Sequence, residues 1–228
     1  MSDFELTLKN PVWYALGETH KKFSISYHGV KFYDPQICTF GAFEDAGNTV
    51  EALNEYSQRV DRFFLVSQNK IPKYDTNFVV LDQKIEGVQM VLDTLETCKI
   101  IETIVPLTHE HIDEIYDLVW LVMPGYYQKR TFEMGDYFGV FKNGKLVSIS
   151  GQRMQTNSFI EVSAVVTHPD YTRLGLAKQL VVHTTNEILK TGKKAILHTT
   201  KGNAAIKLYQ NLGYKITRDM DWWYFCRK

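Results

Sequence analysis

The spacing of apolar and polar residues divides the chain near residue 100. Before that point, apolar residues follow a helical spacing over 12–20 and 49–58, and residues 23–27 alternate as in a half-buried strand. Residues 87–95 fit a helix and a strand equally well. Short apolar runs predict further strands over 39–43, 62–67 and 77–81. The pattern therefore predicts a small α+β unit over residues 1–99.

Residues 100–228 carry a clearer pattern. The Asn143-Gly144 pair lies between two apolar runs and predicts a tight hairpin, because both central residues of such a turn have positive φ. Helices are expected from Thr108 to before Pro124, over 176–190 and over 203–212. Strands are expected over 100–106, 137–142, 146–153, 159–167, 195–199, 214–217 and 222–226. The predicted order is β-α-β-β-β-α-β-α-β-β.

The composition is that of an ordinary globular protein. The 228 residues are 44% hydrophobic and 23% charged, which allows one large or two small domains with their own cores. Lys and Arg number 26, as do Asp and Glu, so the net charge is zero with histidine neutral. A protein that coats nucleic acid or an anionic membrane needs a basic excess, and we expect neither partner.

The cysteines and the first residues indicate a cytoplasmic protein. Cys38, Cys98 and Cys226 form neither a disulfide framework nor a zinc-ligand spacing, and no metal is implied. Asp3 and Glu5 lie in a start that lacks the apolar stretch of a secretory signal. No window holds 18 consecutive apolar residues. We therefore expect a reduced, soluble protein.

The zero net charge conceals an uneven distribution. Residues 1–99 hold 10 Lys and Arg against 14 Asp and Glu, for a net charge of −4. Residues 100–228 hold 16 against 12, for a net charge of +4. The second half therefore suits a small anionic ligand better than the first half does.

The segment 165–177 has the pattern of a strand, a tight loop and a helix start. The first N–H groups of a helix have no partner within it and carry about half a positive charge, so a helix start suits a phosphate. Gly175 lets the backbone approach an anion closely, and Arg173 can add a charge. The alternative is an ordinary strand–helix loop in which the glycine serves only the turn.

Two motifs together resemble those of the GCN5-related N-acetyltransferases (GNATs). Thr172-Arg173-Leu174-Gly175-Leu176-Ala177 is similar to their motif A, Arg/Gln-x-x-Gly-x-Gly/Ala, with a typical run over 166–171 before it. Residues 205–214 read AIKLYQNLGY and are similar to motif B, A-x-x-L-Y-x-x-L-G-F/Y. Both motifs occur in the family's order within the predicted strand and helix pattern. The resemblance covers residues 100–228 and is closest to the FR47-like subgroup.

Two positions depart from the family pattern. Thr172 stands at the first position of motif A, where the family has Arg or Gln, and Arg173 could supply the missing anion-facing group. Gly202 stands three residues before the first residue of motif B, where the family has Asn. Asn203 follows one place later.

The resemblance implies the fold class and the domain organisation. It implies an α+β fold, the α/β sandwich of the acyl-CoA N-acyltransferases, with a mixed, mainly antiparallel sheet flanked by helices. Residues 100–228 would form the catalytic domain. In residues 1–99, the segments 10–13 (NPVW) and 39–43 (TFGAF) resemble the leading regions of some two-part relatives, in which a degenerate acetyltransferase-like half packs on the catalytic half. That half would either shape the acceptor pocket or extend the sheet.

The resemblance also implies acetyl-CoA as the acyl donor and an amine as the acceptor. The pyrophosphate would lie on the backbone N–H groups of 174–177, and the pantetheine arm would pair like an added strand with 164–167. The residues implied in cofactor binding are Ala164, Val165, Val166, Thr167, Thr172, Arg173, Leu174, Gly175, Leu176, Ala177 and Asn203. The sequence does not predict the acceptor, which could be an amino acid, a polyamine, a drug or a protein terminus. It does not predict the oligomeric state either.

Two residues are implied in catalysis. Tyr209, in motif B, would be the general acid that protonates the leaving thiolate, and its alternative role is a packed aromatic on an amphipathic helix. Glu161 would be the general base, since it is the only carboxylate on strand 159–167 and shares a face with Ser163 and Val165 by a period of two. Its alternative role is a solvated edge charge. The function predicted is acyl transfer to a primary amine by direct attack, and the alternative is a non-catalytic acyl-CoA-binding or sensor domain on the same fold.

Overall fold

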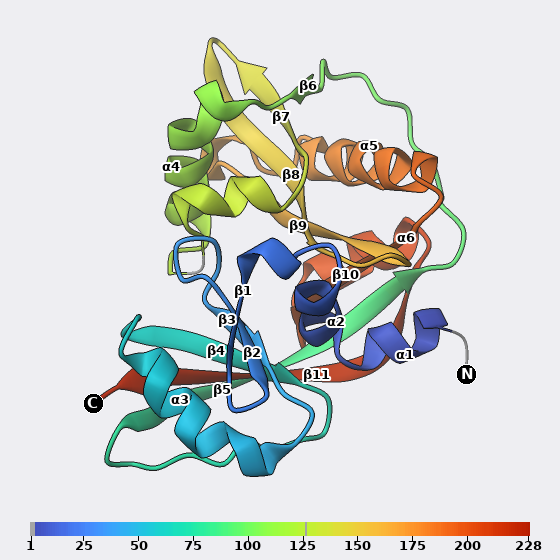
Figure 1. Ribbon diagram of the computed structural model, residues 1–228. Coiled ribbons are helices and arrows are strands. Elements are labelled where there is room, and N and C mark those ends of the chain that lie inside the picture. The colour runs from blue at the N-terminus through green and yellow to red at the C-terminus, as the bar shows by residue number, and fades with distance from the viewer. Residues whose placement is uncertain (1–2, 126) are drawn as a thin grey trace.

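Eleven strands form one mixed sheet in the computed structural model, which describes residues 3–125 and 127–228 (Figure 1). The strands are β1 (Ser24–Tyr27), β2 (Val30–Tyr33), β3 (Phe40–Ala42), β4 (Arg62–Ser67), β5 (Val79–Leu92), β6 (Val105–Pro106), β7 (Tyr137–Lys142), β8 (Lys145–Gln155), β9 (Phe159–Thr167), β10 (Lys194–Thr200) and β11 (Tyr214–Arg227). The helices are α1 (Asp3–Lys9), α2 (Pro11–Gly17), α3 (Thr49–Ser57), α4 (Ile112–Val122), α5 (Leu176–Lys190) and α6 (Ala205–Asn211). The predicted α+β class is confirmed.

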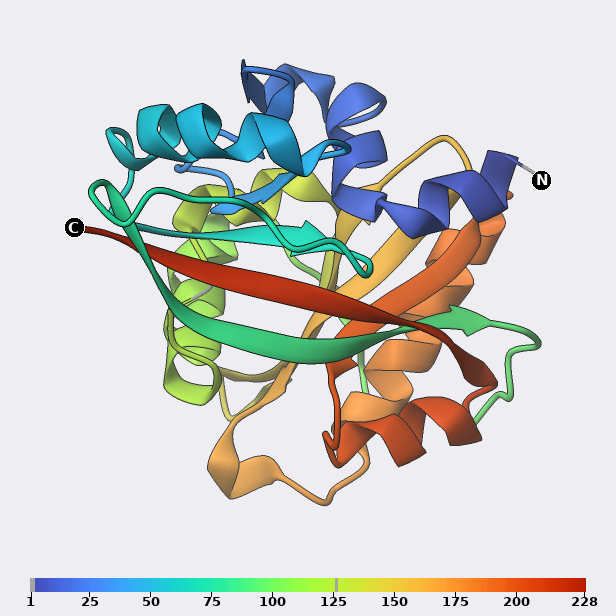
Figure 2. The same ribbon diagram turned by 90° about the horizontal axis from the view of Figure 1, so that it is seen from below.

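The strand order, β1-β2-β3-β4-β11-β5-β10-β9-β8-β7-β6, repeats one arrangement on each side of its centre. On each side two antiparallel pairs lead to a parallel pair, β3–β4 across α3 and β9–β10 across α5. The strand that follows each parallel pair joins the other half of the sheet. β5 follows β4 in the chain but pairs with β10, and β11 follows β10 but pairs with β4. Figure 2 shows β5 and β11 side by side across the molecule, as their antiparallel register requires.

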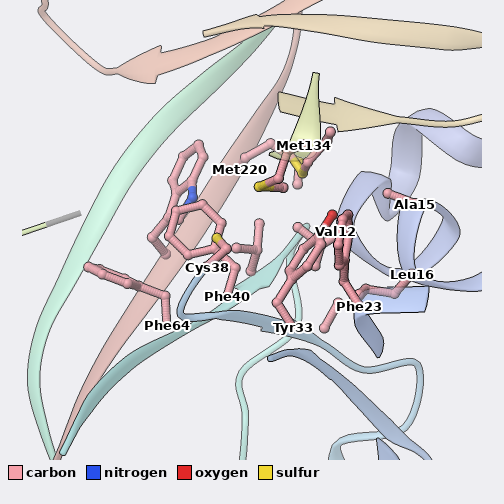
Figure 3. Packing of buried hydrophobic residues seen from close by; sticks show 14 of the residues in the cluster. Val12, Ala15, Leu16, Phe23, Tyr33, Cys38, Phe40, Phe64, Met134 and Met220 are labelled. Carbon is pink, nitrogen blue, oxygen red and sulfur yellow. The ribbon is translucent and has the colours of Figure 1, made fainter. Parts of the chain in front are cut away.

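Side chains on the two faces of the sheet build separate cores. On one face, α1 and α2 share a core with Phe40, Phe64 and Trp222, and Figure 3 shows Phe40 and Phe64 near Cys38 in this core. Helix α4 covers the far end of the same face. On the opposite face, α3 covers Phe63, while α5 and α6 cover the strands of the second half. The centre of the sheet is therefore buried on both sides.

Most predicted elements lie close to their predicted bounds. Helix α5 begins and ends as predicted, and Asn143 and Gly144, both with positive φ, form the hairpin turn between β7 and β8. The runs 77–81 and 87–95 belong to one long strand, β5, which settles the helix-or-strand ambiguity. Helix α1 and strand β2 were not predicted, because both are too short to show a clear period.

Two strand predictions were wrong. Of the strand expected over 100–106, only β6 forms, because the N–H groups of Ile101 and Glu102 bond to Gln179 Oε1 (2.7 and 3.0 Å) instead of to a strand. The separate strands expected over 214–217 and 222–226 are one strand, β11, with an irregular register after Ile216. Its polar stretch continues as a strand because residues 218–221 stay paired with β5.

Candidate active site

The parallel strands β9 and β10 separate partway along their length. Their register begins at Phe159 and Lys194 and ends at Val162 and Leu197. Beyond this point β10 stays paired with β5, and β9 stays paired with β8. The edges of β9 and β10 that face each other therefore leave main-chain N–H and C=O groups without a strand partner in the described sheet.

A β-bulge at Ala164 bends β9 at the split. Ser163 pairs with Gly151 and Val166 pairs with Ile149, so β9 has one residue more than β8 over this stretch. Ala164 itself has φ of 49°, a left-handed conformation that an alanine rarely adopts. The bulge therefore turns β9 away from its parallel neighbour where the edge becomes free.

The bulge also changes which side chains share a face. Val165 packs in the same core as Val162, beneath α5 and α6. Glu161 lies on the other face, bonded to Arg153. The expectation that Glu161, Ser163 and Val165 share a face is therefore wrong for Val165, since the extra residue shifts the alternation.

Helix α5, the next α-helix after β9 in the chain, begins without a side-chain cap. Gly175 is its N-cap residue, with φ of 76°, and no side chain bonds the free N–H groups of the first turn. The first turn holds no acidic residue. Arg173 precedes it with φ of 63°. No side chain in this first turn therefore compensates the partial positive charge of the helix start, which is available to an external anion.

The other predicted cofactor residues take different positions. The hydroxyl of Thr172 donates to Pro169 O (3.1 Å), so it is used within the loop. Leu174 is exposed, and Leu176 is buried in the core under α5. Asn203 lines the cavity described next, and its Oδ1 accepts from the N–H of Ala205 (2.8 Å).

A cavity of about 410 Å³ opens at the split. Residues 162–165 of β9 and 197–200 of β10 form one part of its wall, together with Asn203 and Tyr209. The other part comes from both halves of the chain, namely Phe40, Phe64, Ile85, Met123, Arg153 and Trp222. Val162, Leu197 and Tyr209 belong to the core on one face of the sheet, and Phe40, Phe64 and Trp222 belong to the core on the other, so residues of both faces line the cavity.

Tyr209 presents a free phenol to this cavity. It lies on α6, is 8% exposed, and packs at the edge of the Tyr214 ring. Its hydroxyl has no hydrogen bond among the described residues. Burial raises the pKa of Tyr209 to about 12, so the phenol keeps its proton at neutral pH. It can therefore donate to a sulfur or an oxygen in the cavity.

Glu161 does not line the cavity, and both of its carboxylate oxygens have hydrogen-bond partners. Arg153 donates to both of its oxygens (2.9 and 2.8 Å), and His198 Nδ1 lies 2.7 Å from Oε1. The N–H of Met154 donates to Oε2 (3.3 Å). Burial alone would raise the pKa of Glu161, but Arg153 outweighs it and lowers this pKa to about 2. The alternative of a solvated edge charge is wrong, because the residue is completely buried.

Several lining residues were not predicted from the sequence. Arg153 ends a predicted strand and has no motif around it, and His198 lies in an apolar run. Phe40, Ile85 and Trp222 are brought in by the exchanged pairing of β5 and β11. No local pattern encodes such long-range pairing.

In ranges 3–125 and 127–228, no group of three or more His, Cys, Asp or Glu side chains could hold a metal ion. Within the same ranges, every helix is too short or too polar to cross a membrane.

The split parallel pair, the bulge beside it and the uncapped helix after it define the acyl-CoA N-acyltransferase fold. The model of the FR47-like protein family matches residues 137–223. A structure from Novosphingobium aromaticivorans, assigned to the GNAT family of acetyltransferases, is 26% identical, with a TM-score of 0.87 over 97% of this chain and 98% of its own. No match was found among curated proteins.

Two more distant structures share the fold alone. A GCN5-related N-acetyltransferase from Kribbella flavida is 13% identical, with a TM-score of 0.60 over 90% of this chain and 88% of its own. A tandem GNAT protein from the clavulanic acid biosynthesis pathway is 12% identical, with a TM-score of 0.56 over 87% of this chain and 77% of its own. The fold is therefore that of the GNAT superfamily, and residues 137–223 are similar to the FR47-like family.

Proposed function

We propose that this protein transfers an acetyl group from acetyl-CoA to a primary amine, with Tyr209 as the general acid. The observation that carries the proposal is the free, protonated Tyr209 phenol in a cavity at the split between β9 and β10. Helix α5, which follows β9 in the chain, begins without a side-chain cap.

The described residues fit the parts of acetyl-CoA. The N–H groups of 174–177 at the helix start would hold the pyrophosphate, with Arg173 nearby. The unpaired edge of β9 over 164–167 would pair with the amide groups of the pantetheine arm. Asn203 would contribute its side-chain amide. When bound, acetyl-CoA supplies a thioester whose carbonyl carbon can accept an amine.

The proposed transfer forms one bond and breaks one. The nitrogen of a neutral amine bonds to the carbonyl carbon, and the C–S bond breaks with its electron pair on sulfur. Tyr209 gives its proton to the sulfur as the C–S bond breaks, and the proton that the nitrogen loses returns through solvent to the Tyr209 oxygen, so the phenol is restored. The free edge of β9 offers main-chain N–H groups to the carbonyl oxygen as negative charge develops there.

Glu161 stays a prediction as the general base, and its surroundings favour a different role. A carboxylate with a pKa of about 2 is a weak base, and it does not line the cavity. We propose that it positions Arg153 and His198, whose side chains it bonds. The amine would then enter the reaction already neutral, so the rate should rise with pH until the amine is deprotonated.

A Tyr209→Phe variant tests the acid role, with Tyr214→Phe as its matched control. Both changes remove a buried phenol, but the Tyr214 hydroxyl bonds to Thr185 (2.7 Å) in the core beneath α5 and α6. We expect Tyr209→Phe to lower kcat about 10²-fold or more while leaving the affinity for acetyl-CoA within twofold. Tyr214→Phe should leave kcat unchanged. Unaltered turnover in Tyr209→Phe would exclude the acid role.

A non-catalytic acyl-CoA sensor is the second candidate function. It is favoured by one observation, that no carboxylate among the described residues lines the cavity to accept a proton. Thermal stabilisation by acetyl-CoA is expected for both functions. Release of CoA with a panel of amines separates them, because a sensor releases none.

We also propose that residues 1–99 derive from a degenerate GNAT-like unit. The β1–β2–β3–α3–β4 arrangement matches β7–β8–β9–α5–β10 in order and strand direction. The pair β3–β4 stays in register to Ala42 and Val66, the last residue of β3 and the next to last of β4, so it has no comparable split. Glu44 and Asp45 precede α3, where an anion would otherwise bind. This half therefore lacks the features that would hold acetyl-CoA.

A further inference from the structure

The acceptor has its own side of the cavity. Tyr209 and Val162 belong to the core beneath α5 and α6, whereas Phe40, Phe64 and Trp222 belong to the core beneath α1 and α2. Since Tyr209 would meet the sulfur of acetyl-CoA from the first side, an acceptor would reach the thioester from the second. The ring of Phe40 and the ring of Phe64 meet edge to face there, with centroids 5.5 Å apart (Figure 3).

One charged side chain faces this acceptor side. Arg153 is the only Lys, Arg, Asp or Glu among the described residues that line the cavity. Its guanidinium lies over the Phe40 ring, 4.9 Å from the centroid. None of the described residues that line the cavity is a carboxylate that could offset a second positive charge on a polyamine or another polycationic acceptor. The cavity therefore favours acceptors that carry a negative group.

The hydrogen bonds of Arg153 leave donors available. Its Nε and Nη2 donate to Glu161, and Nη1 has no hydrogen bond among the described residues. The side chain of Arg153 is 19% exposed, while that of Glu161 is 1% exposed. Glu161 thus fixes the guanidinium plane from behind and leaves Nη1 accessible. A fixed guanidinium with free N–H groups, largely out of water, binds a carboxylate through charge-assisted hydrogen bonds.

We propose that the acceptor is an α-amino acid with an aromatic side chain. Its carboxylate would bind Arg153 Nη1, and its ring would lie among Phe40, Phe64 and Trp222, where aromatic pairing adds to apolar burial. This arrangement leaves the α-amine as the only nucleophile of the acceptor. The proposal rests on the proposed acetyltransferase function, and it selects one of the acceptor classes that the sequence leaves open.

The test uses the full chain and four probes. L-Phenylalanine carries both groups, L-phenylalaninamide lacks the negative charge, 2-phenylethylamine lacks the carboxyl group, and spermidine represents a polyamine. Binding of each is measured calorimetrically in the presence of CoA, and turnover is measured by CoA release from acetyl-CoA. We expect L-phenylalanine to bind at least tenfold more tightly than the other three and to give the highest kcat/KM.

Two variants check that Arg153 is responsible. Arg153→Lys keeps a positive charge beside Glu161 but loses the planar guanidinium with its several N–H donors. The double variant Arg153→Gln/Glu161→Gln removes both buried charges together. Both should reduce the preference for L-phenylalanine over 2-phenylethylamine at least tenfold, with stabilisation by acetyl-CoA unchanged. Equal binding of the acid and the amide, no binding of the acid, or a preference that survives in a folded variant would overturn the proposal. Failure of acetyl-CoA to stabilise the wild-type protein would instead count against the proposed function.

Discussion

The indole ring of Trp222 on β11 lies directly on Gly87 of the neighbouring strand β5. A Cβ at Gly87 would overlap the six-membered ring and come within 2.8 Å of Thr199 O. Since Trp222 also lines the cavity, a Gly87→Ala change should push the indole toward the acceptor side. We expect a loss of about 1–3 kcal/mol in the free energy of unfolding from overpacking, together with a raised KM for the acceptor. Urea unfolding and steady-state kinetics measure the two effects.

Gly139→Ala is the matched control for Gly87→Ala. A Cβ at Gly139 would lie 2.6 Å from Leu146 Cδ1, so it also overpacks the protein, against the end of a flexible side chain. Gly139 lies on β7, and neither it nor Leu146 lines the cavity. This variant should lose stability without a change in KM. If both variants alter KM alike, the kinetic effect of Gly87→Ala reflects general loosening and not the cavity.

Gly175 and Gly192 lie at the two ends of helix α5. Comparing an alanine substitution at each position distinguishes the effect of backbone strain from an effect on acetyl-CoA binding. Gly175 has φ of 76° and Gly192 has φ of 79°, and a Cβ at either meets no atom within 4 Å. Replacing either with Ala should therefore cost about 1–2 kcal/mol from the left-handed conformation alone. Only Gly175→Ala places a methyl group at the uncapped helix start. We expect a several-fold weaker affinity for acetyl-CoA in this variant, measured by calorimetry, and none in Gly192→Ala.

Short sequence motifs correctly predicted those parts of the candidate site that lie within a single loop or helix. The loop around Gly175, helix α5 and the position of Tyr209 on α6 each follow from a short motif and a helical period. The bulge at Ala164 has no such signal, because alanine is not a residue that marks a left-handed position. That single extra residue shifted the predicted face of Val165.

The residues on the acceptor side of the cavity could not be predicted from the sequence, for a different reason. Phe40 and Trp222 are far apart in the chain and meet only because β5 and β11 exchange places in the sheet. Arg153 and Glu161 meet across the β8–β9 pair, whose register the bulge alters. Strand exchange and register depend on the whole sheet, so no local pattern predicts them.

The pKa of Glu161 predicts how stability changes with acid. Its folded pKa of about 2 lies below the ordinary value of 4.5, so the stability that Glu161 contributes is present above pH 4.5 and lost as the pH falls toward 2. Glu161→Gln removes it and leaves Arg153 buried without its partner, which should cost about 3–5 kcal/mol at neutral pH. The difference in the free energy of unfolding between wild type and Glu161→Gln should shrink between pH 4.5 and pH 2.

Asp93→Asn serves as the control for this acid dependence. Its partner Lys215 also holds the pKa of Asp93 below the ordinary value, but both side chains are more than half exposed. Solvent screening makes such a pair worth little, so Asp93→Asn should follow the wild-type curve closely. A constant difference between wild type and Glu161→Gln across this pH range would contradict the low pKa of Glu161.

The exchange of β5 and β11 predicts that the two halves unfold together. β11 is held between β4 and β5, and β5 is held between β11 and β10, so neither half keeps a complete sheet without the other. Urea unfolding of the full chain, followed by tryptophan fluorescence and by far-ultraviolet circular dichroism, should give one coincident transition. A chain restricted to residues 100–228 would expose unpaired edges of both β10 and β11, and we expect it to aggregate. A monomeric, cooperatively folded 100–228 fragment would show instead that this half forms its core without the first 99 residues.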